Sequence, residues 1–186
     1  GQYLYKQVED FALALQSKLE AKFPEAQTAI TGQFRRQLEV ISQLEWVTTA
    51  SQLETINFLQ NDQVEILTEG PNSLLLRIED RLTIQFYFAT AETFAETLFA
   101  TSASEEFLAA MQNKMSWKNT PTEEAIFQNA GLLYIPPYLR ESSAITEQAS
   151  KETIDAIVET GSIKGLIHSH SNWSDGAYTI EQMAEE

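Results

Sequence analysis

Three strand-like runs in close succession constrain the fold of this chain more than any other feature. Residues 63–70, 73–80 and 82–89 are rich in β-branched, aromatic and other apolar residues, as β-strands are. The turn-forming triplet GPN (70–72) separates the first two runs, and EDR (79–81) separates the second from the third. The sequence therefore predicts a turn between the first two runs and a tight hairpin between the second and the third.

Helical periodicity predicts two helices that accompany these strands. Apolar residues recur every three or four positions over residues 3–23, and Pro24 marks the end of this amphipathic helix. Residues 51–61 form the second helix, with Ser51 as a possible N-cap and Glu54 as its capping-box partner.

Further strands are predicted over residues 27–32 and 44–50, while residues 34–43 between them form a short helix or an extended connection. Together these elements predict an α+β fold over residues 1–100, with a mixed β-sheet and flanking helices.

The second half of the chain is predicted to be mainly helical. Residues 90–119 form two helices, and residues 120–131 form a third that begins at Thr120 or Thr122 and ends at Gly131.

Composition limits the partners of this chain. The net charge is −15, with 27 acidic against 12 basic residues, and Arg35-Arg36 is the only adjacent basic pair. A protein that follows a phosphate backbone usually has a basic face, so DNA or nucleotide binding is expected to be weak. The absence of cysteine excludes disulfides and thiolate metal sites. No apolar run approaches 18 residues, so no membrane association is expected, and a cytoplasmic location fits.

The sequence GQFRR (residues 32–36) has the residue types of a phosphate-binding turn. Gly32 permits a close approach of the backbone, and the N-terminus of a helix attracts anions. Arg35 and Arg36 supply bidentate donors that are always charged, and Gln33 supplies a further polar contact. We therefore predict phosphate or nucleotide binding by these four residues.

The order of helix, strand, glycine turn, arginine pair and strand resembles the nucleotidyltransferase palm of family X DNA polymerases, in particular the bacterial kind with a C-terminal PHP domain. In that family the turn reads Gly-Ser-x-Arg-Arg. Gly32, Arg35 and Arg36 match it, whereas Gln33 replaces the serine. The family's Phe-Thr-Gly turn, which contacts nucleotide, falls on residues 99–104, with Ser102 in place of the glycine.

The same resemblance places three substituted residues at the family's metal-binding aspartates. Gln43 and Glu45 fall on the Asp-x-Asp pair, and Gln85 falls on the third aspartate. Phosphoryl transfer there uses two Mg²⁺ ions bridged by carboxylates, and one carboxylate with two neutral amides does not neutralise two divalent ions. The resemblance therefore implies a degenerate polymerase site without catalytic residues and without bound Mg²⁺. A relocated acid such as Glu39 is the alternative that would keep one metal.

Two later segments extend the resemblance. Residues 123–141 resemble the end of the thumb in the same polymerases. The motif His-x-His-x4-Asp-Gly, with His168, His170 and Asp175, resembles the first motif of PHP metallophosphoesterases. These three residues would be part of a metal site for Mn²⁺ or Zn²⁺ in a complete PHP domain. The remaining ligands would lie beyond the sequence, so no cofactor is expected in this fragment.

The resemblance implies four segments, namely a palm (1–100), a thumb (101–141), a linker (142–164) and the start of a PHP domain (165–186). The partners implied are the rest of the same chain, with a PHP domain downstream and a helical DNA-binding domain upstream. We hypothesise an inactive polymerase core that binds DNA or nucleotide, or acts as a scaffold, in a DNA repair-type protein. An active DNA-directed nucleotidyltransferase and a non-catalytic protein-interaction module are the alternatives.

Overall fold

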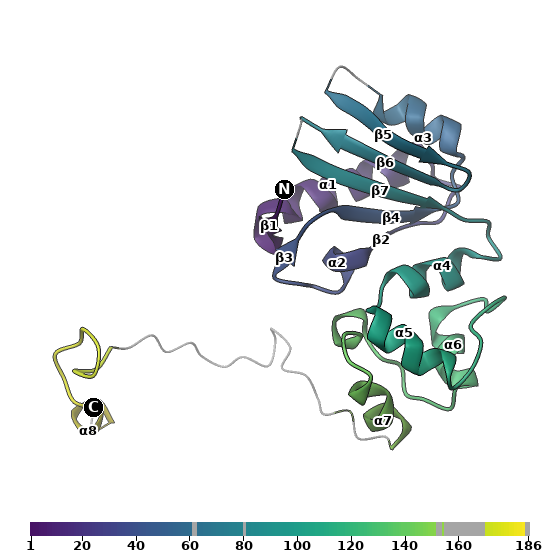
Figure 1. Cartoon of the computed structure of the whole chain (residues 1–186). Helices are drawn as coiled ribbons and strands as arrows, with labels where there is room; N and C mark the ends of the chain where they lie inside the picture. Colours follow the sequence, from purple (N-terminus) through teal and green to yellow (C-terminus); the bar gives the residue numbers. More distant parts are fainter. Residues whose placement is uncertain (61–62, 80, 152–153, 155–169, 185–186) are drawn as a thin grey trace. The chain divides into compact units, whose positions relative to one another are not determined.

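The computed structural model describes residues 1–60, 63–79, 81–151, 154 and 170–184 (Figure 1). These residues belong to two compact units, 1–154 and 155–186. No helix within the described ranges is both long enough and apolar enough to cross a membrane.

A five-stranded mixed sheet organises the first unit, in the order β2-β4-β7-β6-β5. Strands β6 and β7 form the predicted hairpin, and β5 pairs with β6 in the same antiparallel way, with Gly70 pairing with Ser73 across the predicted turn. Strand β4 then pairs with β7 in parallel, which makes the sheet mixed and confirms the predicted α+β class. The strands are β2 (Thr28–Thr31), β4 (Leu44–Thr48), β5 (Val64–Gly70), β6 (Ser73–Ile78) and β7 (Leu82–Phe88).

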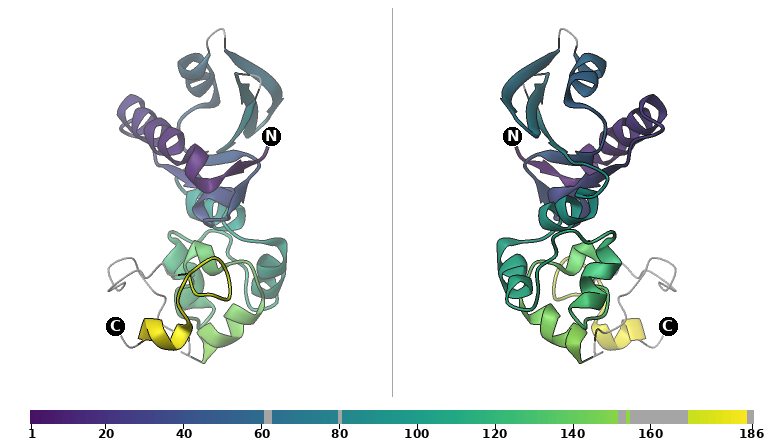
Figure 2. Two further views of the ribbon diagram at one scale, coloured as in Figure 1. Left: turned by 90° about the vertical axis from the view of Figure 1, so that its left-hand side faces the viewer. Right: turned by 90° about the vertical axis from the view of Figure 1, so that its right-hand side faces the viewer.

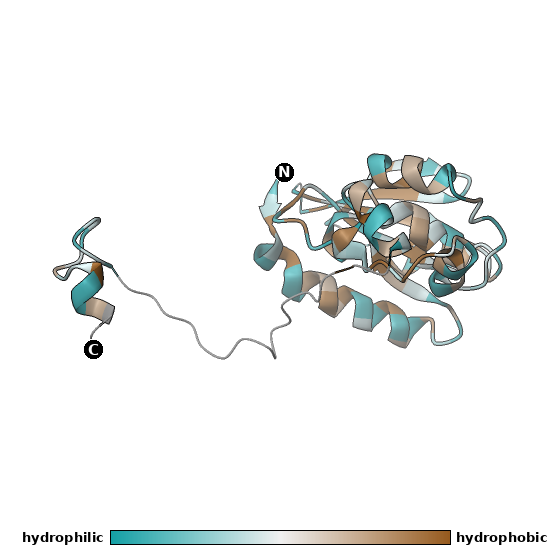
Figure 3. Cartoon of the chain, turned by 90° about the horizontal axis from the view of Figure 1, so that it is seen from below, coloured by the Kyte–Doolittle hydropathy of each residue, from teal (hydrophilic) through white to brown (hydrophobic). Residues whose placement is uncertain are grey.

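Two helices, α1 (Tyr5–Lys22) and α3 (Gln52–Leu59), lie on the same side of the twisted sheet (Figure 2). Apolar and polar residues alternate around α1 at helical spacing (Figure 3), so that its apolar stripe can pack on the sheet. The Ser51 hydroxyl accepts a hydrogen bond from the Glu54 amide, as the predicted cap requires. The buried core of this layer comprises Val8, Ala12, Leu15, Leu19, Phe34, Ile41, Leu44, Trp46, Leu74, Leu76, Ile84 and Phe86.

Tertiary pairing shortens the first predicted helix. The helix begins at Tyr5 because the preceding residues form β1 (Tyr3–Leu4), which pairs with β3 (Val40–Ile41). Residues 34–43, for which the sequence predicts either a short helix or an extended connection, contain parts of both. A short helix, α2 (Gly32–Arg35), begins two residues earlier and ends within this stretch, and β3 follows.

The remainder of the first unit is helical and has its own apolar core around the Phe99, Phe107 and Phe127 rings. Thr122, rather than Thr120, caps α6, because its hydroxyl accepts from the Ala125 amide. The elements are α4 (Phe94–Thr101), α5 (Glu105–Gln112), α6 (Glu123–Asn129), the 3₁₀ turn η1 (Pro137–Leu139) and α7 (Ala144–Ser150). Helix α8 (Ile180–Ala184) belongs to the second unit.

Candidate functional site

A row of side chains crosses the face of the sheet that points away from α1 and α3. Thr31 pairs with Glu45 across β2 and β4, and Glu45 pairs with Gln85 across β4 and β7. Side chains alternate along a strand, and the neighbours Leu44 and Trp46 point into the core beneath the helices. Glu45 and Gln85 therefore lie side by side on the opposite face.

The structure brings together the three residues that were predicted to replace metal-binding aspartates. The Gln43 amide donates a short hydrogen bond to the Glu45 carboxylate. The Gln85 amide donates to the carbonyl of Phe86, at 2.8 Å. One carboxylate and two amides thus form this cluster, and the carboxylate already accepts from one of the amides.

Gly32 lies directly against the Glu45 side chain. Its φ is +63°, in the left-handed region, and a Cβ atom there would fall 1.8 Å from Glu45 Oε2. The adjacent Gln33 ties this turn to the residue before Gln43, because its side-chain oxygen accepts from both the amide and the hydroxyl of Ser42. The glycine turn and the carboxylate cluster are therefore one packed unit.

Burial makes ionisation difficult on this face of the sheet. Burial raises the pKa of the Glu45 carboxyl, although the hydrogen bond from Gln43 and the positive charge of Arg36 act in the opposite direction. Burial and the nearby Glu45 charge raise the pKa of Tyr87 to about 12. The Tyr87 hydroxyl therefore stays protonated at neutral pH, close to the partly desolvated Glu45 carboxyl.

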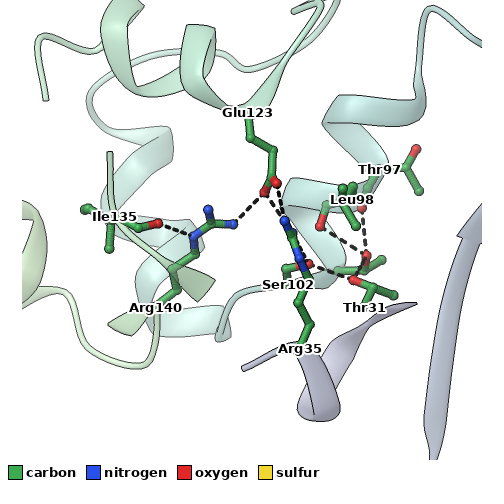
Figure 4. A network of polar contacts seen from close by, with 9 residues as sticks. Thr31, Arg35, Thr97, Leu98, Ser102, Glu123, Ile135 and Arg140 are labelled. Atoms are coloured by element: carbon green, nitrogen blue, oxygen red, sulfur yellow. Dashed lines mark hydrogen bonds and ion pairs between the residues drawn. The ribbon is translucent and has the colours of Figure 1, made fainter. Parts of the chain in front are cut away.

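Arg35 points away from the glycine turn and toward the helical part of the unit (Figure 4). Its two terminal nitrogens contact the Glu123 carboxylate at 3.0 and 2.5 Å, in a bidentate pair. One of them also donates to the Ser102 hydroxyl, at 2.8 Å. Ser102 is fully buried and bonds to the Thr31 hydroxyl as well. Ser102, which was predicted to stand at the glycine of a Phe-Thr-Gly turn, therefore joins β2, α2 and α4.

Arg140 completes this network from the far side of Glu123. Its guanidinium contacts the Glu123 carboxylate at 2.6 Å and the Ile135 carbonyl at 2.8 Å, and its side chain is fully buried. It also lies over the rings of Phe99 and Phe127, with distances to the ring centroids of 5.4 and 5.1 Å. One nitrogen, Nη2, has no hydrogen-bond partner among the described residues.

The Glu123 carboxyl is held ionised by the two arginines. Its burial alone would raise its pKa, but the hydrogen bonds and charges of Arg35 and Arg140 outweigh that effect and hold the pKa below its usual range. We refer to Arg35, Glu123 and Arg140 below as the buried triad.

Arg36, the second arginine of the turn, makes a more exposed contact. Its Nη1 donates to Glu141 at 2.7 Å, and the Glu141 side chain is 44% exposed. Its Nε is buried and has no partner among the described residues. Of the two arginines, Arg36 is thus the one whose carboxylate partner solvent can reach.

Sequence reasoning did not identify Glu123 or Arg140 as partners of the glycine turn. One signal was present, because Arg140 ends the mostly apolar stretch 132–140 and a buried arginine requires a carboxylate. The sequence alone offers many acidic residues for that role, so the pairing depends on the tertiary structure.

In the second unit, His170 and Asp175 lie together, with 2.5 Å between Nδ1 and Oδ1. His168, the other predicted histidine ligand, lies outside the described residues. Among the residues that the structure does describe, no three His, Asp or Glu side chains are grouped so that they could hold a metal ion. The metal site predicted from these three residues stays a prediction.

Comparison with known proteins gives one informative similarity. No family model matches the chain. The chain is 30% identical over 178 residues to the DNA polymerase/3'-5' exonuclease PolX of Bacillus subtilis (strain 168), in an alignment that covers 83% of this chain and 31% of that protein. The chain therefore spans less than a third of the relative that it matches.

Proposed function

The chain is related to the family X DNA polymerases, as its sequence predicts, and from this premise we propose that it is a polymerase core without nucleotidyltransferase activity. In this proposal it serves as a DNA- or nucleotide-binding part, or as a scaffold, of a larger protein with a PHP domain. The observation that carries the proposal is the cluster of Gln43, Glu45 and Gln85 beside Gly32, which contains a single carboxylate.

The residues of this cluster do not fit the metal ions of the family. Mg²⁺ prefers charged oxygen ligands, and a two-ion site has the ions about 3.5–4 Å apart with carboxylates bridging them. The Gln43 and Gln85 amides carry no charge, and burial raises the pKa of the Glu45 carboxyl. We therefore infer that this cluster supports no metal-dependent catalytic step.

Two features support the nucleic-acid part of the proposal. The relative that the chain matches is a DNA polymerase and exonuclease by name. Arg36 lies at the glycine turn, and its partner Glu141 is exposed, so that a phosphate could replace Glu141 at the Nη1 end of the guanidinium. Arg35 is the weaker phosphate ligand of the pair, because a phosphate would have to displace the buried Glu123. The net charge of −15 opposes tight binding.

The PHP part of the proposal rests on the second unit. His170 and Asp175 lie next to each other and are hydrogen-bonded, so both side chains are near enough to turn toward one ion, and His168 belongs to the same motif. We propose that these residues contribute to an Mn²⁺ or Zn²⁺ site once the rest of a PHP domain is present.

A primer-extension assay of the full chain tests the loss of polymerase activity. We expect no template-dependent incorporation with Mg²⁺ or Mn²⁺, under conditions in which an active family X polymerase extends the same primer, because the cluster has one carboxylate. Incorporation that disappears in the Glu45→Ala variant would instead establish the active-nucleotidyltransferase alternative.

Restoration of the acids tests the metal argument directly. The variant Gln43→Asp/Glu45→Asp/Gln85→Asp is expected to gain an Mn²⁺ site that the parent chain lacks, as measured by electron paramagnetic resonance of free and bound Mn²⁺. The control Gln2→Asp/Gln128→Asp adds the same net charge at exposed positions and should gain no such site. Equal Mn²⁺ binding by the parent chain and the restored variant would show that the amides do not prevent metal binding.

A further inference from the structure

The loop between α5 and α6 carries unpaired positive charge in a chain that is strongly acidic overall. Residues 107–122 contain no Asp or Glu, whereas the net charge of the chain is −15. Lys114 and Lys118 lie in this stretch, and both are exposed. Neither has a carboxylate within ion-pair distance among the described residues. Five other basic residues do form such pairs, namely Lys6, Arg35, Arg36, Arg77 and Arg140.

A small pocket lies within the same loop. Its volume is about 220 Å³, and it is lined by Gln112, Met115, Ser116, Trp117 and Lys118. The apolar part of this lining comes from Met115 and the half-buried Trp117 indole, while the amide and hydroxyl side chains supply hydrogen-bonding groups.

The folded core holds this pocket in place. The Trp117 ring packs against the fully buried Phe99 ring, with 5.1 Å between the ring centroids. The Glu96 carboxylate of α4 accepts a hydrogen bond of 2.8 Å from the amide of Asn119, which has a positive φ of 57°. Among the described contacts, Glu96 is the one acidic side chain with a hydrogen bond to residues 112–119. Its carboxylate binds the backbone amide of Asn119 and forms no ion pair with Lys114 or Lys118.

We propose that residues 112–118, which comprise the last residue of α5 and the first part of this loop, are a contact site for single-stranded nucleic acid. An unstacked base would enter the pocket against Met115 and Trp117, and the flanking phosphates would contact Lys114 and Lys118. Stacking on an aromatic side chain together with cationic contacts to the backbone is the usual chemistry of single-strand binding. A duplex keeps its bases stacked and paired, so it offers no base to a pocket of this size. The inference rests on the proposed function, in which the chain contacts nucleic acid.

Binding of a fluorescein-labelled oligothymidylate of twelve nucleotides, measured by anisotropy at low salt, tests the site. The variant Lys114→Ala/Lys118→Ala is expected to bind about tenfold more weakly, and its plot of log K against log salt should be shallower by about 1.4, because two phosphate contacts are lost. The control Lys6→Ala/Lys151→Ala removes the same charge from two exposed positions and should bind like the parent chain.

Ultraviolet crosslinking of the same oligonucleotide locates the base independently of charge. Under the proposal, peptide mapping finds the crosslink within residues 112–118. Equal weakening by both lysine pairs, or full competition by polyglutamate, would overturn the proposal in favour of a general anion effect. Unchanged binding in the Lys114/Lys118 variant with loss in Arg36→Ala would overturn this site and leave the proposed function standing. No binding by the parent chain would overturn both this site and the nucleic-acid part of the proposed function.

Discussion

The Glu123→Gln variant is expected to lose about 3 kcal/mol of unfolding free energy, because removal of one partner from a buried ion pair leaves an uncompensated charge. Here the substitution affects two charges, since Arg35 and the fully buried Arg140 share the same carboxylate. The loss is measured by urea unfolding followed through tryptophan fluorescence, for which the buried Trp46 is a suitable reporter.

The neighbouring residue supplies a matched control for this experiment. Glu124 also lies in the first turn of α6 but is exposed, so Glu124→Gln removes the same charge from the same helix end. Glu124→Gln should change the unfolding free energy by no more than about 0.5 kcal/mol. If Glu123→Gln costs no more than this control, the buried triad does not contribute to stability.

The pH dependence of the Glu123→Gln effect follows from the lowered pKa of Glu123 in the folded chain. A carboxyl whose pKa is lower in the folded than in the unfolded chain stabilises the fold fully above its unfolded pKa, which is about 4.3 for glutamate. This stabilisation is lost as the pH falls through the pKa of the folded chain. The difference in unfolding free energy between the parent chain and Glu123→Gln should thus be constant near neutral pH. It should shrink toward zero as the pH falls into the acid range.

Gly32→Ala is expected to lower the unfolding free energy by about 3 kcal/mol, as Glu123→Gln does, because it combines two unfavourable effects. A non-glycine residue at a φ of +63° costs about 1 kcal/mol, and the new methyl group must displace the Glu45 carboxylate, which adds about 2 kcal/mol. In a Glu45→Ala background only the first penalty remains, so a double-mutant cycle measured by urea unfolding separates the two.

Gly131 is the control for the backbone penalty. It has nearly the same φ, +66°, and no atom lies within 4 Å of a Cβ built on it. Gly131→Ala should therefore cost about 1 kcal/mol, whatever residue stands at position 45. Equal costs of Gly32→Ala in both backgrounds would mean that Glu45 does not pack against the turn as described.

Local signals predicted much of the fold. The two turn triplets specified β5, β6 and β7, and the Ser51 cap specified the start of α3, because each depends on a few neighbouring residues. The start of α1 was wrong by two residues, because Tyr3–Leu4 pairs with β3, and no local pattern encodes that pairing.

The candidate site was predictable only in part. The resemblance to the polymerase family identified Gln43, Glu45 and Gln85, and the parallel pairing of β4 with β7 places Glu45 beside Gln85. The alternation of apolar and polar residues along a strand could not have predicted this pairing. The alternation indicates which face of the sheet a residue lies on, but not which strand lies next to it. The partner of Arg35 was not predicted, because Glu123 is distant in sequence. Nothing in the sequence distinguishes Glu123 from the adjacent Glu124 as the partner of a buried arginine.

The buried triad has a consequence for how the sequence can vary. One carboxylate serves two guanidinium groups, so the effect of a substitution at position 35, 123 or 140 depends on the residues at the other two. A neutral residue at 123 becomes acceptable only when apolar side chains replace the arginines, and loss of one arginine makes the other more important. We therefore expect these three positions to be epistatic and to change together, although they are spread over more than half of the chain.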